Sequence, residues 1–304
     1  MAAAAEDARA AGVSVAVDRW VRGETTHTQD RVAEEVPVAL LYNGEPHVVM
    51  LATPANLEDL GWGFTLSEEL VAAPDEIRGV EVEAGDEQAQ VRIAIAWERF
   101  PELLRRRRNL TGRTGCGLCG AETLEQAVRS HPGVGAGPRV SVAALHEAIE
   151  RLSALQPLNA STGSVHAAAW VVPAGPGVGV AVAADDRGAA DGAGMAGGTH
   201  MGAGAGIEIA CVREDVGRHN ALDKCIGALV RARADFGAGF MLVTSRASYE
   251  MVQKAAAMGI SFLAALSAPT SFAVRQAQQC GMTLVAFARR EQHVVYAHPG
   301  RLVA

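Results

Sequence analysis

Strand-like and helix-like patterns alternate through the last third of the chain, and this alternation most constrains the fold. The pattern predicts strand, helix, strand, helix, strand and strand over 240–244, 249–258, 260–266, 270–279, 282–287 and 294–296. Connections of this kind join parallel strands, with the intervening helices packed on the sheet. We therefore predict an α/β domain with a largely parallel sheet.

Three polar segments follow the predicted parallel strands, at 244–246, 267–271 and 287–290. Because the carboxyl ends of parallel strands meet at one edge of a sheet, these segments should lie together. They carry hydroxyl groups, two predicted helix N-termini and the guanidinium groups of Arg246, Arg289 and Arg290. Guanidinium groups and helix N-termini both bind phosphate. The sequence therefore predicts a phosphate or pyrophosphate site at this edge.

The first third of the chain has shorter patterns, with a hairpin turn at Asn43 and Gly44 and a helix that begins near Thr53. The predicted strands are 13–17, 35–42, 48–51, 80–83 and 91–95. We expect a disordered N-terminus over 1–12, a small α+β domain over 13–110 and a larger α/β domain over 111–304. The tract 188–206 is nearly all glycine and alanine, and we predict a flexible insertion there.

Cys116 and Cys119 lie three positions apart in a glycine-rich stretch, 114–120, that leaves both thiols accessible. A predicted helix over 121–128 would place them near its N-terminus, which favours the thiolate. The two cysteines fit a redox dithiol, half of a zinc site or a sulfur-transfer pair. The alternative without a function is two inert, buried thiols. No histidine stands two residues before a glutamate, so a zinc deaminase is disfavoured.

A second dense group of polar residues spans 214–224 and leads into a helix. We interpret it as a loop that binds a base and a phosphate; the alternative is a capped helix start with surface ion pairs. Its candidate residues are Asp215, Arg218, His219, Asn220 and Lys224. His166 fits a general base or a core histidine equally well, and the arginine run 105–108 is most simply a solvated surface.

Composition limits the class of partner. The net charge of −7 offers no general attraction to nucleic acid or to anionic membranes, and no signal peptide or membrane segment is apparent. Five scattered cysteines argue against a secreted disulfide scaffold, and Cys211, Cys225 and Cys280 fall at apolar core positions. We expect a cytoplasmic protein that binds neither nucleic acid nor membrane.

With these residues in view, the chain resembles the formate dehydrogenase accessory sulfur-carrier family, FdhD, nearly from end to end. The motifs that carry the resemblance are Glu35, Val36 and Pro37; Met50, Thr53 and Pro54; Gly63, Phe64 and Glu68; 116–120; Thr162, Gly163 and His166; 214–221 with Asp223 and Lys224; 244–246; 267–270; and Thr283, Leu284, Phe287 and Arg289. Asn159 and Ser164 depart from the pattern of the family, which has an aromatic residue and a glycine there.

The resemblance implies a cytidine-deaminase-like three-layer α/β domain with a smaller α+β N-terminal domain, usually as a homodimer. It implies that a cysteine desulfurase supplies persulfide sulfur to Cys116, with Cys119 as its partner. The sulfur would go to molybdenum bis(molybdopterin guanine dinucleotide), a bound substrate that formate dehydrogenase, the client, requires in sulfurated form. No structural metal is predicted.

The residues that would bind this cofactor are Phe287, Ala288, Arg289, Arg290, Glu291, Gln292, Asp215, Arg218, His219, Asn220, Lys224 and Arg246. Two other functions compete with sulfur transfer. One is a chaperone that holds the cofactor or the apoenzyme without moving sulfur, and the other is a dithiol oxidoreductase.

Overall fold

The computed structural model describes residues 11–85, 87–108, 133–173 and 206–304. Cys116, Cys119 and the predicted helix over 121–128 lie outside these residues, as do nearly all of the predicted insertion and most of the predicted disordered N-terminus. The predicted domain boundary at 110 also falls outside them.

The larger domain is built on a six-stranded sheet whose order is β13-β12-β11-β10-β8-β9. Its strands are β8 (His166–Pro173), β9 (Ile207–Asp215), β10 (Phe240–Val243), β11 (Phe262–Ala265), β12 (Thr283–Arg289) and β13 (Gln292–Ala297). The three central strands β10, β11 and β12 are parallel, as the alternation predicts. Strand β8 is antiparallel to both β10 and β9, so β9 runs in the same direction as β10.

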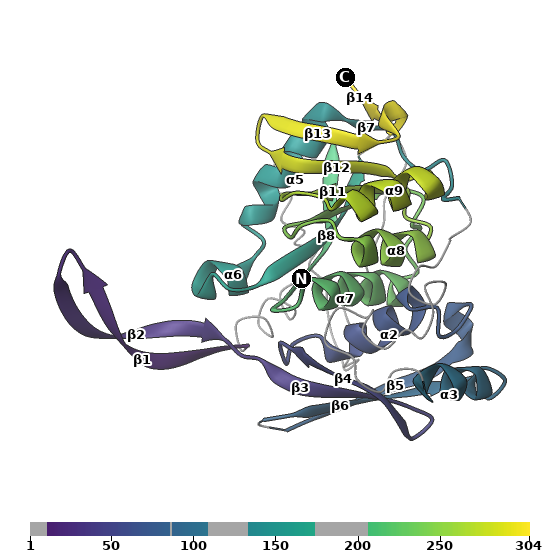
Figure 1. Cartoon of the computed structure of the whole chain (residues 1–304), viewed down its shortest axis with the longest axis horizontal. Coiled ribbons are helices and arrows are strands. Elements are labelled where there is room, and N and C mark those ends of the chain that lie inside the picture. The colour runs from purple at the N-terminus through teal and green to yellow at the C-terminus, as the bar shows by residue number, and fades with distance from the viewer. Residues whose placement is uncertain (1–10, 86, 109–132, 174–205) are drawn as a thin grey trace, which may run out of the picture.

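Helices cover both faces of this sheet (Figure 1). On one face lie α7 (Arg218–Arg231), α8 (Tyr249–Ala257) and α9 (Ser271–Cys280), which pack Leu222 and Met251 against Met241 and Val243. On the other lies α5 (Val142–Ser153), whose Leu145 packs with Phe240 and other sheet residues. The Ser141 hydroxyl accepts a hydrogen bond from the Ala144 amide at 3.1 Å and caps α5. The predicted three-layer α/β architecture is confirmed.

The smaller domain has a four-stranded sheet of order β4-β3-β6-β5 with α2 (Leu57–Ser67) on one face. Its strands are β3 (Val36–Tyr42), β4 (Glu45–Ala52), β5 (Ile77–Ala84) and β6 (Ala89–Ile95). Asn43 and Gly44 both have positive φ, 49° and 89°, which is the hairpin turn that Asn-Gly favours. The short helix α3 (Phe100–Arg108) follows β6.

A long hairpin, β1 (Gly12–Val21) and β2 (Glu24–Ala33), stands away from both domains (Figure 1). The sequence predicts only five residues of β1 and misses β2, because β2 is polar on both faces and lacks the alternation of a half-buried strand. Three short elements complete the larger domain: β7 (Val140–Ser141), α6 (Pro157–Thr162) and β14 (Leu302–Val303). In the described residues, no helix combines the length and the apolar composition that crossing a membrane requires.

The two domains meet where α2 crosses α7 at very short range. A Cβ built on Gly63 would lie 1.7 Å from the backbone oxygen of Asp223, and one built on Gly227 would lie 1.9 Å from that of Asp59. Only glycine therefore fits at these two positions. The close crossing fixes α7, and with it the start of α7, against the smaller domain.

Candidate functional site

One edge of the six-stranded sheet collects the ends of several strands. Strands β9, β10, β11 and β12 all end there, and β8 begins there, with His166 paired in register to Asp215. The Thr244 hydroxyl accepts a hydrogen bond from the Ala167 amide at 2.8 Å, which ties the end of β10 to the start of β8. We take this carboxyl edge as the candidate functional site.

Backbone hydrogen bonds join the loops that follow β10, β11 and β12. The Ala247 amide donates to Ala268 at 3.2 Å, and the Thr270 amide donates to Ala247 at 2.9 Å. The Phe287 amide donates to Ser267 at 3.1 Å. The prediction that the three polar segments share one edge is therefore confirmed.

Three helices begin at this edge, with Gly217, Ser248 and Thr270 as the N-cap residues of α7, α8 and α9. The Thr270 hydroxyl caps α9 by accepting from the Ala273 amide at 3.2 Å. The Ser248 hydroxyl is buried and has no hydrogen-bond partner among the described residues. Three helix N-termini give the edge a positive electrostatic character that suits an anion.

Asp215, at the end of β9, is held by five hydrogen bonds. Its Oδ1 accepts from the Gly217 amide at 2.7 Å and from Asn220 Nδ2 at 3.0 Å. Its Oδ2 accepts from the Thr53 amide and hydroxyl, at 3.1 and 2.9 Å, and from Lys224 Nζ at 2.5 Å. The side chains of Asp215 and Lys224 are both 0% exposed. This carboxylate joins the turn before α7 to the smaller domain.

These contacts bear on three of the predicted cofactor-binding residues, whose binding of a ligand stays a prediction. The side chains of Asp215 and Lys224 have no exposed surface. Asn220 Nδ2 donates to Asp215 Oδ1 at 3.0 Å and to the backbone oxygen of Leu51 at 2.8 Å. The Asp215 carboxylate, Lys224 Nζ and Asn220 Nδ2 are therefore all engaged within the chain. We assign them a positioning role: they hold the turn that carries Arg218 and His219.

Two further buried ionic clusters lie along the domain interface, and the sequence analysis missed both. Lys254 Nζ contacts both Asp223 oxygens, at 3.0 and 2.9 Å, as well as Ser67 and Glu68. Burial alone would lower the pKa of Lys254, but Asp223 and Glu68 outweigh it and raise the pKa. Asp59 pairs with Arg213 at 2.8 Å and with Arg231 at 2.7 Å. All eight residues of 220–227 are buried in the structure, although this segment contains the charged residues Asp223 and Lys224. The sequence alone does not show that burial.

The other polar residues at the edge are mostly basic or neutral, with Glu250 in the first turn of α8 as an acidic neighbour 4.0 Å from His219 Nε2. Arg246 is exposed, and Arg218, His219 and His166 are half-buried. Burial, together with the charges of Arg218 and Arg246, lowers the pKa of His166. Burial is also the main cause that lowers the pKa of His219 to about 3, with Arg218 and Lys254 adding to it. Both histidines are therefore neutral near pH 7.

His219 should make the folded chain sensitive to mild acid. An unfolded chain protonates this histidine near its ordinary pKa of 6.5, whereas the folded chain does so only near 3. Stability is therefore lost as the pH falls from 6.5 toward 3, and the share due to His219 between pH 6.5 and 4.5 is on the order of 2 kcal/mol. In urea unfolding at these two pH values, His219→Gln should lose less stability than the parent chain. Equal losses would contradict the buried, neutral state of His219.

The stretch from Phe287 to Gln292 forms the end of β12, a tight turn and the start of β13. Phe287 has a positive φ of 48° at an irregularity between β12 and β13, and its side chain is 37% exposed. A non-glycine residue in this conformation is strained, and such strain is concentrated at functional positions. Ala288 is buried, and Arg289, Glu291 and Gln292 are exposed. Arg290 instead turns to α5 and pairs with Glu150 at 2.5 Å.

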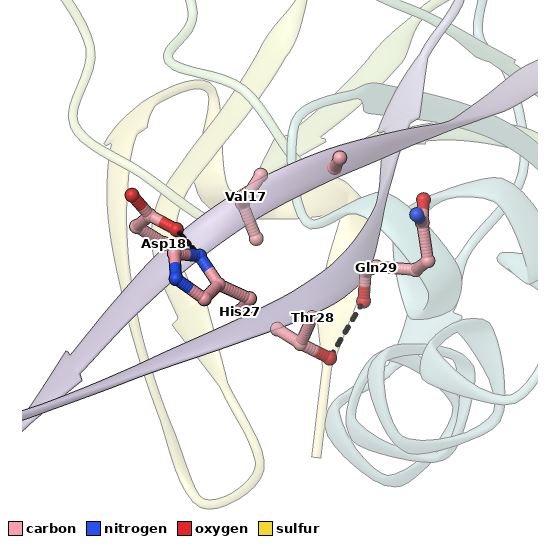
Figure 2. Close-up of a pocket in the computed structure, with 6 residues that line it drawn as sticks. Val17, Asp18, His27, Thr28 and Gln29 are labelled. Atoms are coloured by element: carbon pink, nitrogen blue, oxygen red, sulfur yellow. Dashed lines mark hydrogen bonds and ion pairs between the residues drawn. The ribbon is translucent and has the colours of Figure 1, made fainter.

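Two surface hollows lie elsewhere. One, of about 460 Å³, is lined by Ala16, Val17, Asp18, His27, Thr28 and Gln29 on the β1–β2 hairpin (Figure 2). The other, of about 560 Å³, lies near the end of β6 and includes Asn43, Arg78 and Trp97. Across the described ranges, no three His, Cys, Asp or Glu side chains gather as a metal site. Because Cys116 and Cys119 are not among these residues, the absence of a structural metal stays a prediction.

The sequence of the chain matches known proteins along nearly its whole length. Residues 33–188 and 187–303 match the FdhD/NarQ family. The chain belongs to the FdhD/NarQ family. Two relatives in it are named sulfur carrier protein FdhD. The one from Cupriavidus necator is 47% identical, over 94% of this chain and 88% of the relative. The one from Xanthomonas campestris pv. campestris is 47% identical, over 94% of this chain and 90% of the relative.

A solved structure shares the fold. It is described as a putative formate dehydrogenase accessory protein from Desulfotalea psychrophila. It superposes with a TM-score of 0.65 at 20% identity, over 96% of this chain and 99% of that one. At this identity the likeness supports the fold alone. The two-domain α/β fold is therefore one that this other chain also adopts.

Proposed function

We propose that this FdhD/NarQ chain is a sulfur carrier that serves formate dehydrogenase. The observation that carries the proposal is the 47% identity, over 94% of the chain, to proteins named sulfur carrier protein FdhD. Cys116 is the proposed carrier, Cys119 assists by exchange or by resolving the product, and a cysteine desulfurase is the proposed donor. The proposal includes a cytoplasmic location and a homodimer.

Acceptance of the sulfur needs only one thiolate on this chain. The Cys116 thiolate attacks the outer sulfur of the donor persulfide, so that a new S–S bond forms at Cys116 and the S–S bond of the donor breaks. The donor leaves as a thiolate, and the outer sulfur keeps its proton. No oxidant or reductant is consumed. The glycines at 115, 117 and 120 leave the thiol free of bulky neighbours in sequence.

The carboxyl edge is the proposed seat of the cofactor, which is the substrate of the transfer. The residues present fit a ligand rich in phosphate and polar ring atoms. Arg246 and Arg289 are exposed cations for the pyrophosphate. His219 Nε2 and the Ser248 hydroxyl are buried atoms without a hydrogen-bond partner among the described residues, and a bound base could supply one. Phe287 offers an exposed aromatic face.

Removing one guanidinium group from this edge should weaken nucleotide binding. For Arg246→Ala or Arg289→Ala we expect an affinity for guanosine diphosphate, used as the probe, that is roughly tenfold lower, because each loses a charge-assisted hydrogen bond. Isothermal titration calorimetry at low salt measures this.

Arg151→Ala is the matched control, because Arg151 lies on α5, is exposed and pairs with Glu147 at 3.1 Å. It should leave the affinity unchanged. Equal affinities for all four chains would contradict the placement of the site. A Cys116→Ala chain should bind guanosine diphosphate as the parent does, because the proposal places the thiol and the nucleotide site at different positions.

A further inference from the structure

Two neighbouring helices begin at the carboxyl edge, and each carries a buried polar atom without a hydrogen bond at its start. Helices α7 and α8 lie side by side on one face of the six-stranded sheet (Figure 1). His219 is in the first turn of α7, and its Nε2 has no hydrogen-bond partner among the described residues. Ser248, the N-cap of α8, is 6% exposed, and no described group bonds its hydroxyl. Because buried polar atoms are nearly always satisfied, these two atoms indicate a ligand that contributes the missing bonds.

Glu250, two residues after Ser248, adds a carboxylate beside His219. Its Oε2 lies 4.0 Å from His219 Nε2, and the two side chains are 18 and 17% exposed. That distance is too long for a hydrogen bond, and within the described part of the chain Glu250 makes no other polar contact. Because burial keeps His219 neutral near pH 7, the contact is not an ion pair either. The carboxylate is therefore available to accept hydrogen bonds from a ligand.

The packing on both sides of Glu250 holds the first turn of α8 in place. Met251, which follows it, is fully buried in the core of the larger domain. Tyr249, which precedes it, stacks on Phe272 of α9, with ring centroids 4.3 Å apart and an angle of 6° between the ring planes. The carboxylate of Glu250 is therefore carried by a rigid element next to His219.

A half-buried carboxylate is an unexpected group at an edge that suits anions. Three helix N-termini and the exposed Arg246 make the edge positive, and a negative side chain there opposes the binding of phosphate. A glutamate in the first turn also interacts favourably with the helix dipole, but that interaction requires neither burial nor a neighbouring imidazole. The acid instead suits a ligand that combines phosphate with a group rich in hydrogen-bond donors.

We propose that Glu250 selects guanine as the base of the nucleotide that binds at the carboxyl edge, and that His219 assists it. Guanine has two adjacent donors, the N1–H group and the 2-amino group, and one carboxylate accepts from both. An amino group placed between Glu250 and His219, whose atoms are 4.0 Å apart, can donate one hydrogen to each at about 2.9 Å. Adenine would set its N1 acceptor against the carboxylate. The inference rests on the nucleotide site of the proposed function and adds the residue that distinguishes the base.

Glu250→Gln tests this role because it keeps the size of the side chain and reverses one hydrogen bond. The amide oxygen still accepts from N1–H, but the amide nitrogen meets the 2-amino group of guanine donor to donor. Xanthine has a carbonyl oxygen at that position, which accepts from the amide. In isothermal titration calorimetry at low salt, the variant should bind guanosine diphosphate at least roughly tenfold more weakly than the parent, and xanthosine diphosphate at least roughly tenfold more tightly.

General electrostatics predicts the opposite result for guanosine diphosphate. Removal of a negative charge near a phosphate site should tighten the binding of any nucleoside diphosphate. Glu147→Gln is the matched control, because Glu147 lies on α5, on the other face of the sheet, and its side chain is 24% exposed. It should keep the affinities of the parent for both nucleotides. Circular dichroism and thermal melts check that both variants fold.

The parent chain offers a second test that needs no substitution. Inosine diphosphate differs from guanosine diphosphate only by the absence of the 2-amino group. It should bind the parent roughly tenfold more weakly, because the hydrogen bonds of that group to Glu250 and His219 are lost. Equal affinities for the two nucleotides would overturn the proposal.

The two affinities of Glu250→Gln separate a failure of this inference from a failure of the proposed function. A variant that keeps the preference of the parent for guanosine over xanthosine diphosphate would overturn the role of Glu250 and leave the nucleotide site in place. A parent chain that binds neither nucleotide would contradict the nucleotide site and this inference together. Sulfur transfer by Cys116 is measured separately, by the mass of the chain, and does not depend on these results.

Discussion

Asp215→Ala should destabilise the folded chain by about 3–5 kcal/mol, the range expected when one partner of a buried ion pair is removed. The carboxylate accepts five hydrogen bonds. Its loss leaves Lys224 Nζ fully buried, and within the described part of the chain its remaining partners are the Thr53 hydroxyl and carbonyl oxygens, at 2.9 and 3.0 Å. Urea unfolding followed by circular dichroism measures the change.

A control and a rescue sharpen this test. Glu83→Ala removes an ion pair between Glu83 and Arg92, whose side chains are 56% and 49% exposed respectively. Because this pair is exposed, its removal should change stability by less than about 1 kcal/mol. Asp215→Asn combined with Lys224→Met removes both charges and should recover part of the loss. A loss below about 1 kcal/mol for Asp215→Ala would show that the carboxylate does not hold the domains together.

Gly227→Ala should be nearly as costly, with an expected loss of at least about 3 kcal/mol. The new methyl group would lie 1.9 Å from the Asp59 carbonyl oxygen, which is backbone and cannot rotate away, so α2 and α7 must separate. That separation would also strain the buried pairs of Asp59 with Arg213 and Arg231.

Gly79→Ala is the matched control for this substitution. Gly79 lies on β5, and a Cβ there would meet nothing within 4 Å. Its replacement should be tolerated, with stability unchanged or slightly raised because alanine restricts the unfolded chain. The two variants are compared by urea unfolding. If Gly227→Ala behaves like Gly79→Ala, the close crossing of α2 and α7 is wrong.

The parts of the fold that depend on local sequence could be predicted. The strand and helix alternation after residue 240, the Asn-Gly turn at 43–44 and the Ser141 cap each depend on residues a few positions apart. The shared edge followed from the parallel direction of neighbouring strands. The buried thiols Cys211, Cys225 and Cys280 followed from apolar periodicity.

The missed features depend on contacts between distant parts of the chain. Thr53 and Asp215 are 162 positions apart, and Lys254 and Ser67 are 187 apart, so neither pair leaves a local pattern. For this reason the contacts by which Asp215, Asn220 and Lys224 join the two domains could not be predicted from the sequence. Strand β2 of the β1–β2 hairpin was missed because its sequence does not alternate, whereas part of β1 was predicted.

The most direct test of the central claim is the intact mass of the full chain after incubation with a cysteine desulfurase and cysteine. The account predicts that the parent chain gains one or more sulfur atoms, that a thiol reductant removes them, and that Cys116→Ala gains none. Cys211→Ala, which lacks a buried thiol, is the control and should gain sulfur as the parent does. No gain in the parent, with the desulfurase shown to be active, would contradict sulfur transfer and favour a chaperone that only holds the cofactor.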